Sequence, residues 1–481
     1  METRNLIGGA WRNAASGKRM KVADPATDAP VAEVPECGAA ETAEALDAAA
    51  AALPAWRSLT AQERAAPLRR MARLMLEETE RLAALMTLEQ GKPLAEARGE
   101  VAYAAGFLEW AAEEGRRVYG ETIPAAVPGK RLLVLPRPVG VTMAVTPWNF
   151  PLAMITRKLG PALAAGCTQV VKPAEQTPLC AIAIAEISMR AGLPPGVLNL
   201  VTGQPGPIVE TAFRHPALRK VSFTGSTEVG KLLMRHAAER VVRLSLELGG
   251  HAPFLVFDDA DLDQAVAGAV ASKFRNTGQT CICANRILVQ RGVHQRFLER
   301  FTAATRALVV GRGDQPGVQV GPLIDDAALL KVERHVEDAR RRGARILCGG
   351  ARAAVAGCAD RFWQPTVIAD ATPEMECCRE ETFGPVAPVQ VFDTEEEAIR
   401  RANDTPYGLA AYFYTRDASR LFRLMEALEY GVLGANDALP AVPQAPFGGV
   451  KESGFGREGG RHGLQEYLTL HYVSVGIQPG P

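Results

Sequence analysis

Residues 139–146 read VGVTMAVT, the first of five short β-rich runs that decide the fold. The others are CTQVVKP (167–173), GVLNLVTG (196–203), KVSFTG (220–225) and SLELGGHAPFLVF (245–257). Segments of helical character separate them. Strands that alternate with helices in this way predict a parallel, doubly wound sheet with helices on both faces. We therefore expect an α/β fold with a Rossmann-like first domain.

The sequence changes in texture on either side of this stretch. Residues 40–119 are rich in Ala, Leu, Glu and Arg, and their apolar residues recur every three or four positions, which predicts long amphipathic helices. Beyond His251 a second β/α series continues to about Gln444. The hairpin-like KRLLVLPRPVG (130–140) interrupts the first domain, and we expect it to pair across subunits with QEYLTLHYVSVG (465–476).

Length and charge narrow the functional class. A chain of 481 residues is too long for one core, so two or three domains are expected. The 54 Lys and Arg residues balance the 54 Asp and Glu residues, and without a dense basic run we expect neither nucleic acid nor a membrane as partner. The sequence has neither a signal-peptide-like apolar core nor 18 uninterrupted apolar residues, which predicts a cytoplasmic protein.

The nine cysteines argue against a disulfide framework, because they are odd in number and scattered. Two close pairs, Cys281/Cys283 and Cys377/Cys378, lack the spacing of a structural zinc site, and the seven histidines are dispersed. We expect no metal. In FRNTGQTCICANR (274–286), however, Cys281 lies among small polar residues, unlike a structural cysteine in an apolar run. It is a candidate nucleophile.

One glycine-rich turn, FTGSTEVGKLL (223–233), lies at a strand–helix junction, where backbone N–H groups and the helix dipole favour an anion. Gly225, Gly230 and Lys231 nearly complete a Walker A loop, but Leu232 replaces the hydroxyl residue that would hold Mg²⁺. A pyrophosphate-bearing cofactor fits the turn better than ATP hydrolysis. A tight connection without ligand is an equally good interpretation.

Five segments in order resemble the aldehyde dehydrogenase superfamily over nearly the whole chain. They are VTPWNFP (145–151), KPAEQTP (172–178), LELGG (246–250), GQTC (278–281) and EETFGPV (380–386). The form FRNTGQTCICANR, together with ITRK (155–158), is most similar to the succinate-semialdehyde dehydrogenase branch.

The resemblance implies three structural parts. An NAD-binding domain comprises residues 1–118 and 141–249, and a second α/β catalytic domain comprises residues 250–446. A small β oligomerisation arm and tail comprise residues 119–140 and 447–481, which implies a homodimer or homotetramer.

The resemblance also assigns the catalytic groups. A carbonyl carbon gives up hydride readily only after a nucleophile has added, so the Cys281 thiolate would form a thiohemiacetal and then a thioester. A free thiol has a pKa of about 8.5, so either a lowered pKa or a nearby base is required. Glu247 would be that base, and the side chain of Asn149 with the backbone N–H of Cys281 would hold the oxyanion. From the residues alone, a salt-bridged carboxylate at the end of a strand is the favoured interpretation of Glu247, and a turn residue is that of Asn149.

The cofactor residues follow from the same resemblance. Glu175, at the end of a strand, would accept hydrogen bonds from a free ribose 2′-hydroxyl and so favour NAD, while Lys172 leaves NADP as an alternative. The other implied contacts are Trp148, Gly225, Ser226, Leu248, Glu381 and Phe383. Core packing is a competing interpretation of Phe383.

The aldehyde substrate is implied less specifically. Arg157 and Arg275 match positions that grip the distal carboxylate of succinate semialdehyde, although either arginine could instead belong to an ion pair. Ala441 and Val442 stand where the branch usually has a serine that completes this site. A longer ω-carboxylated semialdehyde, such as that of glutarate or 2-oxoglutarate, therefore stays open.

Other hypotheses remain beside this one. A cysteine hydrolase or acyltransferase would use Cys281 and Glu247 without redox chemistry, and a P-loop nucleotidase would need the hydroxyl that Leu232 replaces. Cys283 is either a packing residue or, as in some members of the branch, a redox partner of Cys281. Two residues along an extended chain point to the same side, which would bring these thiols close.

Overall fold

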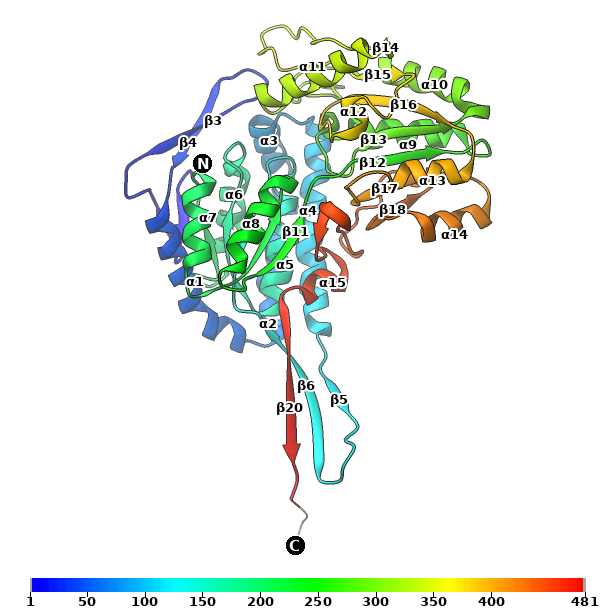
Figure 1. Cartoon of the computed structure of the whole chain (residues 1–481). Coiled ribbons are helices and arrows are strands. Elements are labelled where there is room, and N and C mark those ends of the chain that lie inside the picture. The colour runs from blue at the N-terminus through cyan, green and yellow to red at the C-terminus, as the bar shows by residue number, and fades with distance from the viewer. Residues whose placement is uncertain (1, 479–481) are drawn as a thin grey trace.

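A computed structural model describes residues 2–478 of the chain. The strands form three main sheets and two short hairpins. The predicted α/β fold is confirmed, because two of these sheets are largely parallel and alternate with helices. Figure 1 shows the two α/β units next to each other, with a narrow β arm that extends away from the first unit.

Six strands form the first sheet, in the order β19-β11-β10-β7-β8-β9. Neighbours pair in parallel except β19, which is antiparallel to β11. The bounds are β7 Val141–Val145, β8 Thr168–Lys172, β9 Leu198–Leu200, β10 Leu218–Thr224, β11 Arg243–Glu247 and β19 Gly454–Phe455. Every residue of β7 is buried, as expected for a parallel strand covered on both faces.

The order of the strands creates a switch point beside β7. The chain continues from β7 to β8 and β9 on one side, and then returns to β10 on the other side of β7. The loops that follow β7 and β10 therefore diverge, which leaves a crevice at the carboxyl ends of these strands, where ligands of doubly wound folds bind.

Helices surround this sheet, and the long helices predicted for residues 40–119 are present. They are α1 Ala39–Ser58, α2 Ala61–Glu77, α3 Thr79–Gln90, α4 Leu94–Glu114, α5 Ala153–Ala165, α6 Pro178–Arg190, α7 Pro205–Arg214, α8 Thr227–Ala238 and α15 Gly460–Gln465. The start of α2 is fixed by a capping box, in which Thr60 accepts from the backbone N–H of Glu63 and Glu63 accepts from that of Thr60.

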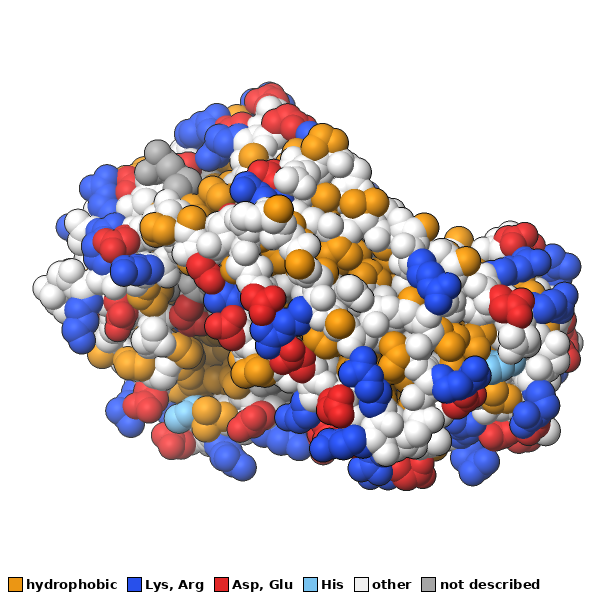
Figure 2. Space-filling model, turned by 90° about the horizontal axis from the view of Figure 1, so that it is seen from above, with side chains coloured by type: hydrophobic (Ala, Val, Ile, Leu, Met, Phe, Trp, Pro, Cys, Tyr) orange, Lys and Arg blue, Asp and Glu red, His pale blue; other side chains and the backbone are white. Residues whose placement is uncertain are grey.

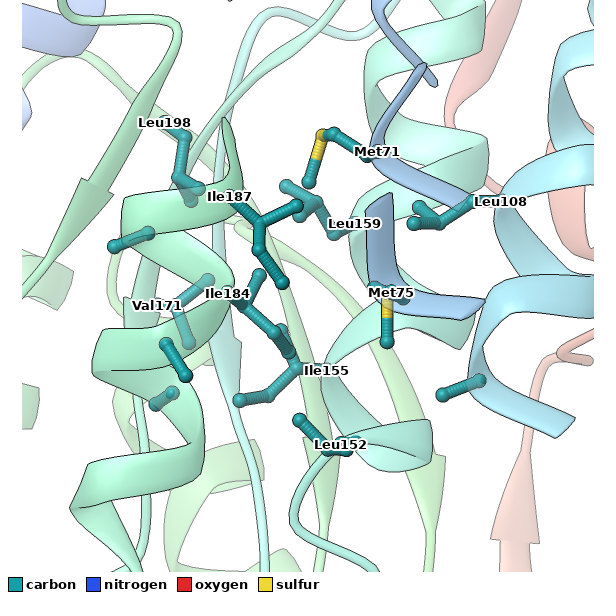
Figure 3. Packing of buried hydrophobic residues seen from close by; sticks show 14 of the residues in the cluster. Met71, Met75, Leu108, Leu152, Ile155, Leu159, Val171, Ile184, Ile187 and Leu198 are labelled. Carbon is teal, nitrogen blue, oxygen red and sulfur yellow. The ribbon is translucent and has the colours of Figure 1, made fainter. Parts of the chain in front are cut away.

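Apolar side chains lock these helices to the sheet, and Figure 3 shows part of this core. The labelled residues are Met71, Met75, Leu108, Leu152, Ile155, Leu159, Val171, Ile184, Ile187 and Leu198. Leu159 of α5 is fully buried among them. Its truncation to alanine would cost about 2–5 kcal/mol of unfolding free energy. The core therefore holds α5 rigidly, and with it Arg157.

Seven strands form the second sheet, in the order β14-β15-β16-β13-β12-β17-β18, as the second β/α series predicted. The strands are β12 Ala252–Val256, β13 Ala284–Gln290, β14 Arg345–Cys348, β15 Thr366–Ala369, β16 Val386–Phe392, β17 Ala410–Tyr414 and β18 Val432–Ala435. The helices are α9 Leu262–Phe274, α10 Arg291–Arg306, α11 Asp326–Arg341, α12 Glu376–Arg379, α13 Glu395–Asn403 and α14 Ala418–Ala427. Only β14, which is antiparallel to β15, departs from parallel pairing among the strands described.

The arm is a three-stranded sheet of β5 Glu121–Ile123, β6 Lys130–Pro138 and β20 Leu468–Gly476. The segment expected to be hairpin-like is the single strand β6, and it pairs with β20 of its own chain. The expected boundary of the tail at residue 447 also differs from the structure. Gly454–Phe455 pairs with β11, and Gly460–Gln465 packs on α4 and α5. Both segments therefore belong to the first domain, and the arm takes up the chain again only at β20.

Short elements complete the described chain. The hairpins pair β1 Asn5–Ile7 with β2 Ala10–Arg12 and β3 Arg19–Ala23 with β4 Pro30–Pro35, and 3₁₀ turns cover Gly115–Arg117, Arg275–Gly278 and Lys451–Ser453. Between residues 2 and 478 no helix is long and apolar enough to cross a membrane. On the face shown in Figure 2, Lys and Arg side chains are interspersed with Asp and Glu.

Candidate active site

Cys281 lies where two cavities meet. A smaller cavity of about 350 Å³ and a larger one of about 710 Å³ both include its partly exposed side chain in their walls. Cys281 follows the 3₁₀ turn Arg275–Gly278 and precedes β13, so the second domain presents the thiol to the carboxyl edge of the first sheet. A substrate in one cavity and a cofactor in the other would meet at this sulfur.

The larger cavity collects six of the eight predicted cofactor residues. They are Trp148, Gly225, Ser226, Leu248, Glu381 and Phe383, and Asn149 lines it too. The rings of Trp148 and Phe383 meet edge to face, 5.5 Å apart. Phe383 therefore faces this cavity and is not a simple core residue. Its left-handed backbone, with φ of 54°, is a strained conformation of the kind found at ligand sites.

The carboxyl of Glu381 lies in the wall of the larger cavity and accepts a hydrogen bond from the backbone N–H of Gly250 at 3.1 Å. Burial raises the pKa of Glu381 to about 7. A sugar hydroxyl that donates to this group would stabilise its ionised form, so this acceptor fits a nucleotide ribose.

The glycine-rich turn lies at the start of α8. Ser226 caps the helix by accepting from the backbone N–H of Val229 at 3.3 Å, and Gly225 precedes it at the end of β10. Lys231 points elsewhere, because its ammonium forms an exposed ion pair with Glu452 at 2.8 Å. The turn therefore offers backbone N–H groups to an anion but lacks the lysine of a Walker A loop.

Lys172 and Glu175 do not line the larger cavity. Lys172 is the last residue of β8, and Glu175 lies three positions later in the loop that follows, where the two side chains form an ion pair. Lys172 is buried, which lowers the pKa of its ammonium to about 7. Residue 172 is the register partner of Val145 in β7, so the pair lies one strand away from the loop that carries Trp148 and Asn149.

The thiol of Cys281 is not activated by its surroundings alone. Burial, reinforced by the carboxyl of Glu381, raises its pKa to about 12, against the opposing effect of Arg157. Of the two ways to generate a thiolate, this environment favours removal of the proton by a nearby base over a lowered pKa.

Glu247 is fully buried at the end of β11 and lines neither cavity. Neither of its carboxylate oxygens has a hydrogen-bond partner among the described residues, so it is not the salt-bridged carboxylate of the alternative interpretation. Burial and the neighbouring carboxyl of Glu458 hold its pKa well above the usual range. An unpaired carboxyl with a raised pKa has the properties of a general base.

Asn149 follows β7 and is buried beside Cys281 in the larger cavity. Its Nδ2 donates to the carbonyl of Gln279 at 3.1 Å, which fixes the plane of the amide and occupies one of its two protons. The second proton is the one that an oxyanion on the adduct would accept. The side chain thus faces the site instead of closing a local turn.

Arg157 and Arg275 both line the smaller cavity together with Cys281. The guanidinium of Arg275 lies 5.4 Å from the ring of Phe150. Arg157 is buried, with Nε 2.5 Å from a carboxylate oxygen of Glu458, so the ion-pair alternative applies to it in part. Its Nη2 has no hydrogen-bond partner among the described residues and so remains to bind an acceptor.

The structure corrects the expectation that the chain between Cys281 and Cys283 is extended. The chain turns at Thr280–Cys283, where the backbone N–H of Cys283 donates to the carbonyl of Thr280 at 3.1 Å, so it is not extended here. Cys283 is fully buried, and its thiol donates to the carbonyl of Lys273 at 3.4 Å. These contacts are those of a packing residue.

Several lining residues were not predicted. Tyr103 of α4 lines the smaller cavity with Glu96, Gly99 and Glu100, and Leu439 comes from the loop after β18. Ala441, which the resemblance placed at this site, lines the cavity from the same loop. The helical spacing of positions 96, 99, 100 and 103 indicates a shared face, but the sequence does not show what this face contacts. Val442 is absent from the wall of this cavity.

Comparisons with known proteins show the family of the chain. The sequence profile of the aldehyde dehydrogenase family matches residues 11–473. The NADP(+) succinate-semialdehyde dehydrogenase of Escherichia coli strain K12 is 55% identical over 98% of this chain and 97% of that protein. The glutarate-semialdehyde dehydrogenase of Pseudomonas putida is 54% identical, with the same coverage. A crystal structure of an E. coli NADP-dependent enzyme superposes with a TM-score of 0.97 at 55% identity, covering 99% of this chain and 98% of that one.

Proposed function

The chain belongs to the aldehyde dehydrogenase family and is an NAD(P)-dependent enzyme of that class, and we propose that it oxidises succinate semialdehyde or glutarate semialdehyde. The observation that carries the proposal is the position of Cys281. Its thiol borders both the cavity with two arginines and the cavity with the predicted cofactor residues.

The proposed chemistry begins at Cys281. Its sulfur adds to the aldehyde carbon, and the new oxyanion accepts hydrogen bonds from Asn149 Nδ2 and the backbone N–H of Cys281. A bound nicotinamide supplies the hydride acceptor that this step needs. The resulting thioester is hydrolysed by water, which releases the carboxylic acid and restores the thiol.

Glu247 is proposed to take the proton from the thiol, and later from the water. Its raised pKa makes the ionised carboxylate a stronger base than an ordinary glutamate. Its carboxyl lines neither cavity, so the side chain must rotate towards Cys281 to act. Within residues 2–478 no hydrogen bond to either oxygen opposes this rotation.

The two arginines support the carboxylated substrate class. Arg157 and Arg275 place two guanidinium groups in the wall that also contains the thiol, a suitable arrangement for a carboxylate at the far end of a short aldehyde. Ala441 lines the same cavity without a hydroxyl and leaves room that a longer chain fills. Glutarate semialdehyde is therefore proposed beside succinate semialdehyde.

The experiment compares aldehydes of equal chain length with and without the distal carboxylate. We expect kcat/KM for succinate and glutarate semialdehydes to exceed that for butanal and pentanal by about tenfold to a hundredfold, since a charge-assisted pair contributes about 1.5–3 kcal/mol. Arg275→Met should remove most of this preference. Equal rates for both groups, or a preference that survives the substitution, would contradict the substrate proposal.

We also propose that the arm joins copies of the chain into a homodimer or homotetramer. Large apolar side chains are exposed on β20, among them Leu470 at 69% and Tyr472 at 62%. Such residues along an extended strand are expected to be covered by a partner. Tyr472→Asp should shift the mass measured by light scattering to a smaller species, and an unchanged mass would remove this support.

A cytoplasmic location is the remaining part of the proposal. All nine cysteines are free thiols. This state is typical of a reducing compartment. Fractionation of the native cell, with the protein followed by antibody, tests the location.

A further inference from the structure

Three consecutive residues just before the nucleophile have left-handed backbones. The φ angles of Asn276, Thr277 and Gly278 are 51°, 59° and 72°. A β-branched residue rarely adopts this conformation, and a run of three is held only where the surroundings impose it.

The second domain holds this left-handed turn from one side. The hydroxyl of Thr277 lies 3.2 Å from the carbonyl oxygen of Gly321 and accepts from its N–H at 3.0 Å. The amide of Gln279 accepts from the backbone N–H of Ile324 at 3.0 Å. Gly278 packs so closely on Gly384 that an added Cβ would lie 2.3 Å from its carbonyl oxygen.

Asn276 holds the turn to the first domain from the other side. Its Nδ2 donates to the carbonyl of Asn149 at 3.0 Å and to the carbonyl of Gln279 at 3.2 Å, and its backbone N–H donates to Glu96 at 2.7 Å. One fully buried amide therefore joins the segment that carries the side chain of Asn149 to the segment that leads to Cys281.

Lys92 strengthens the same junction. Its buried ammonium donates to the carbonyl of Asn149 at 2.8 Å and pairs with Glu100. Glu100 in turn accepts from the backbone N–H groups of Leu152 and Ala153 at the start of α5. The carbonyl of Asn149 is thus held by two donors, one of which is shared with Gln279.

We propose that Asn276 is a positioning residue that sets the distance between the two oxyanion donors, the Asn149 amide and the backbone N–H of Cys281. The inference rests on the proposed function, in which these donors stabilise the adduct. Asn276 does not line either cavity, so it acts through Asn149 and Gln279 and not on the substrate.

The test uses Asn276→Gly, which permits the left-handed backbone and removes only the bridging amide. We expect the pre-steady-state rate of NADH formation from succinate semialdehyde to fall about tenfold to a hundredfold, below the effect of losing an oxyanion donor outright. KM and NAD affinity should change less than about threefold, because both cavities keep their walls. Asn276→Asp, which has the size but not the donor, should be equally slow, and wild-type rates in either variant would overturn the proposal.

Two measurements separate positioning from general loss of structure. Asn436→Gly is the matched control, because Asn436 is also left-handed, with φ of 53°, and also donates to a backbone carbonyl, that of Thr415. It should lower Tm without slowing NADH formation. Alkylation of Cys281 by iodoacetamide, which forms no oxyanion, should keep its wild-type rate in Asn276→Gly, and a parallel loss of alkylation would overturn the positioning role.

A double-mutant cycle tests the route of the effect. In an Asn149→Ala background, Asn276→Gly should slow NADH formation much less than it does alone, because one of the donors that it positions is already missing. Losses that multiply fully would overturn the proposal. If the wild type forms no NADH with any aldehyde, the proposed function fails and the inference with it. An active wild type with an unimpaired Asn276→Gly refutes the inference alone.

Discussion

Lys172 and Glu175 form an ion pair at the carboxyl end of β8, one strand away from the loop that carries Trp148 and Asn149. Glu175 is partly exposed, whereas Lys172 is buried. A ribose that reaches this edge of the sheet would meet the carboxylate first, and a 2′-phosphate would be repelled by it.

Glu175→Ser should therefore raise the ratio of kcat/KM for NADP to that for NAD by about tenfold, which corresponds to about 1.4 kcal/mol. The pKa of Lys172, about 7, adds a pH dependence, because the ammonium that attracts a 2′-phosphate is lost as the pH rises through that value. The increase in the NADP to NAD ratio that Glu175→Ser causes should be larger at about pH 6 than at about pH 8. Glu210→Ser, on the exposed surface of α7, is the control, and an unchanged ratio would remove Glu175 from the ribose site.

Glu247→Gln should slow both the burst of NADH formation and the steady-state rate, each by about a hundredfold or more. The reason is the raised pKa of Cys281, which leaves the thiol without a nucleophilic form unless a base takes its proton. In the wild type the burst rate should rise with pH as Glu247 ionises and level off above the pKa of Glu247, whereas the small burst left in the variant should keep rising as the thiol itself ionises. A variant that retains a full burst and stalls afterwards would restrict Glu247 to thioester hydrolysis.

The thiol itself should titrate at high pH. With a pKa of about 12, the thiolate fraction of cofactor-free Cys281 rises about tenfold per pH unit throughout the range from about pH 7 to pH 10. Iodoacetamide labelling, quantified for the peptide that contains Cys281 by mass spectrometry, should follow this slope. A plateau below about pH 9 would show that the site lowers the pKa of the thiol instead.

A redox role of Cys283 remains a prediction, and treatment with peroxide followed by a reducing agent tests it. Mild peroxide should inactivate the wild type, and dithiothreitol should restore activity if Cys283 closes a disulfide with Cys281. Cys283→Ala should then pass to irreversible oxidation of Cys281 under the same treatment. Equal recovery of variant and wild type would leave Cys283 as the packing residue that its contact with Lys273 indicates.

Local patterns in the sequence were sufficient for the two β/α series, whereas the roles of Trp148 and Leu248 were implied only by the resemblance to the family. The strand order of the first sheet explains why these two residues lie near Gly225, because all three follow parallel strands at the same edge. The return of Gly454–Phe455 to the first sheet could not be foreseen, because a two-residue strand has no periodicity to detect.

The state of individual side chains also lay beyond the sequence. Whether Arg157 binds substrate or Glu458 depends on a contact between residues 301 positions apart. The raised pKa values of Cys281 and Glu247 arise from burial, which only the packed structure reveals. The turn at Cys281 is likewise fixed by contacts of Gln279 with the distant Ile324, and so the predicted extended chain was wrong.

The most direct test of the account is NADH formation by wild type and Cys281→Ala with succinate semialdehyde, measured beside NAD binding to both proteins. We expect the variant to bind NAD with nearly wild-type affinity, because the thiol forms only one part of the wall of the larger cavity, and to form no NADH, because no adduct arises. More than trace turnover by Cys281→Ala would contradict the assignment of the nucleophile and, with it, the proposed function.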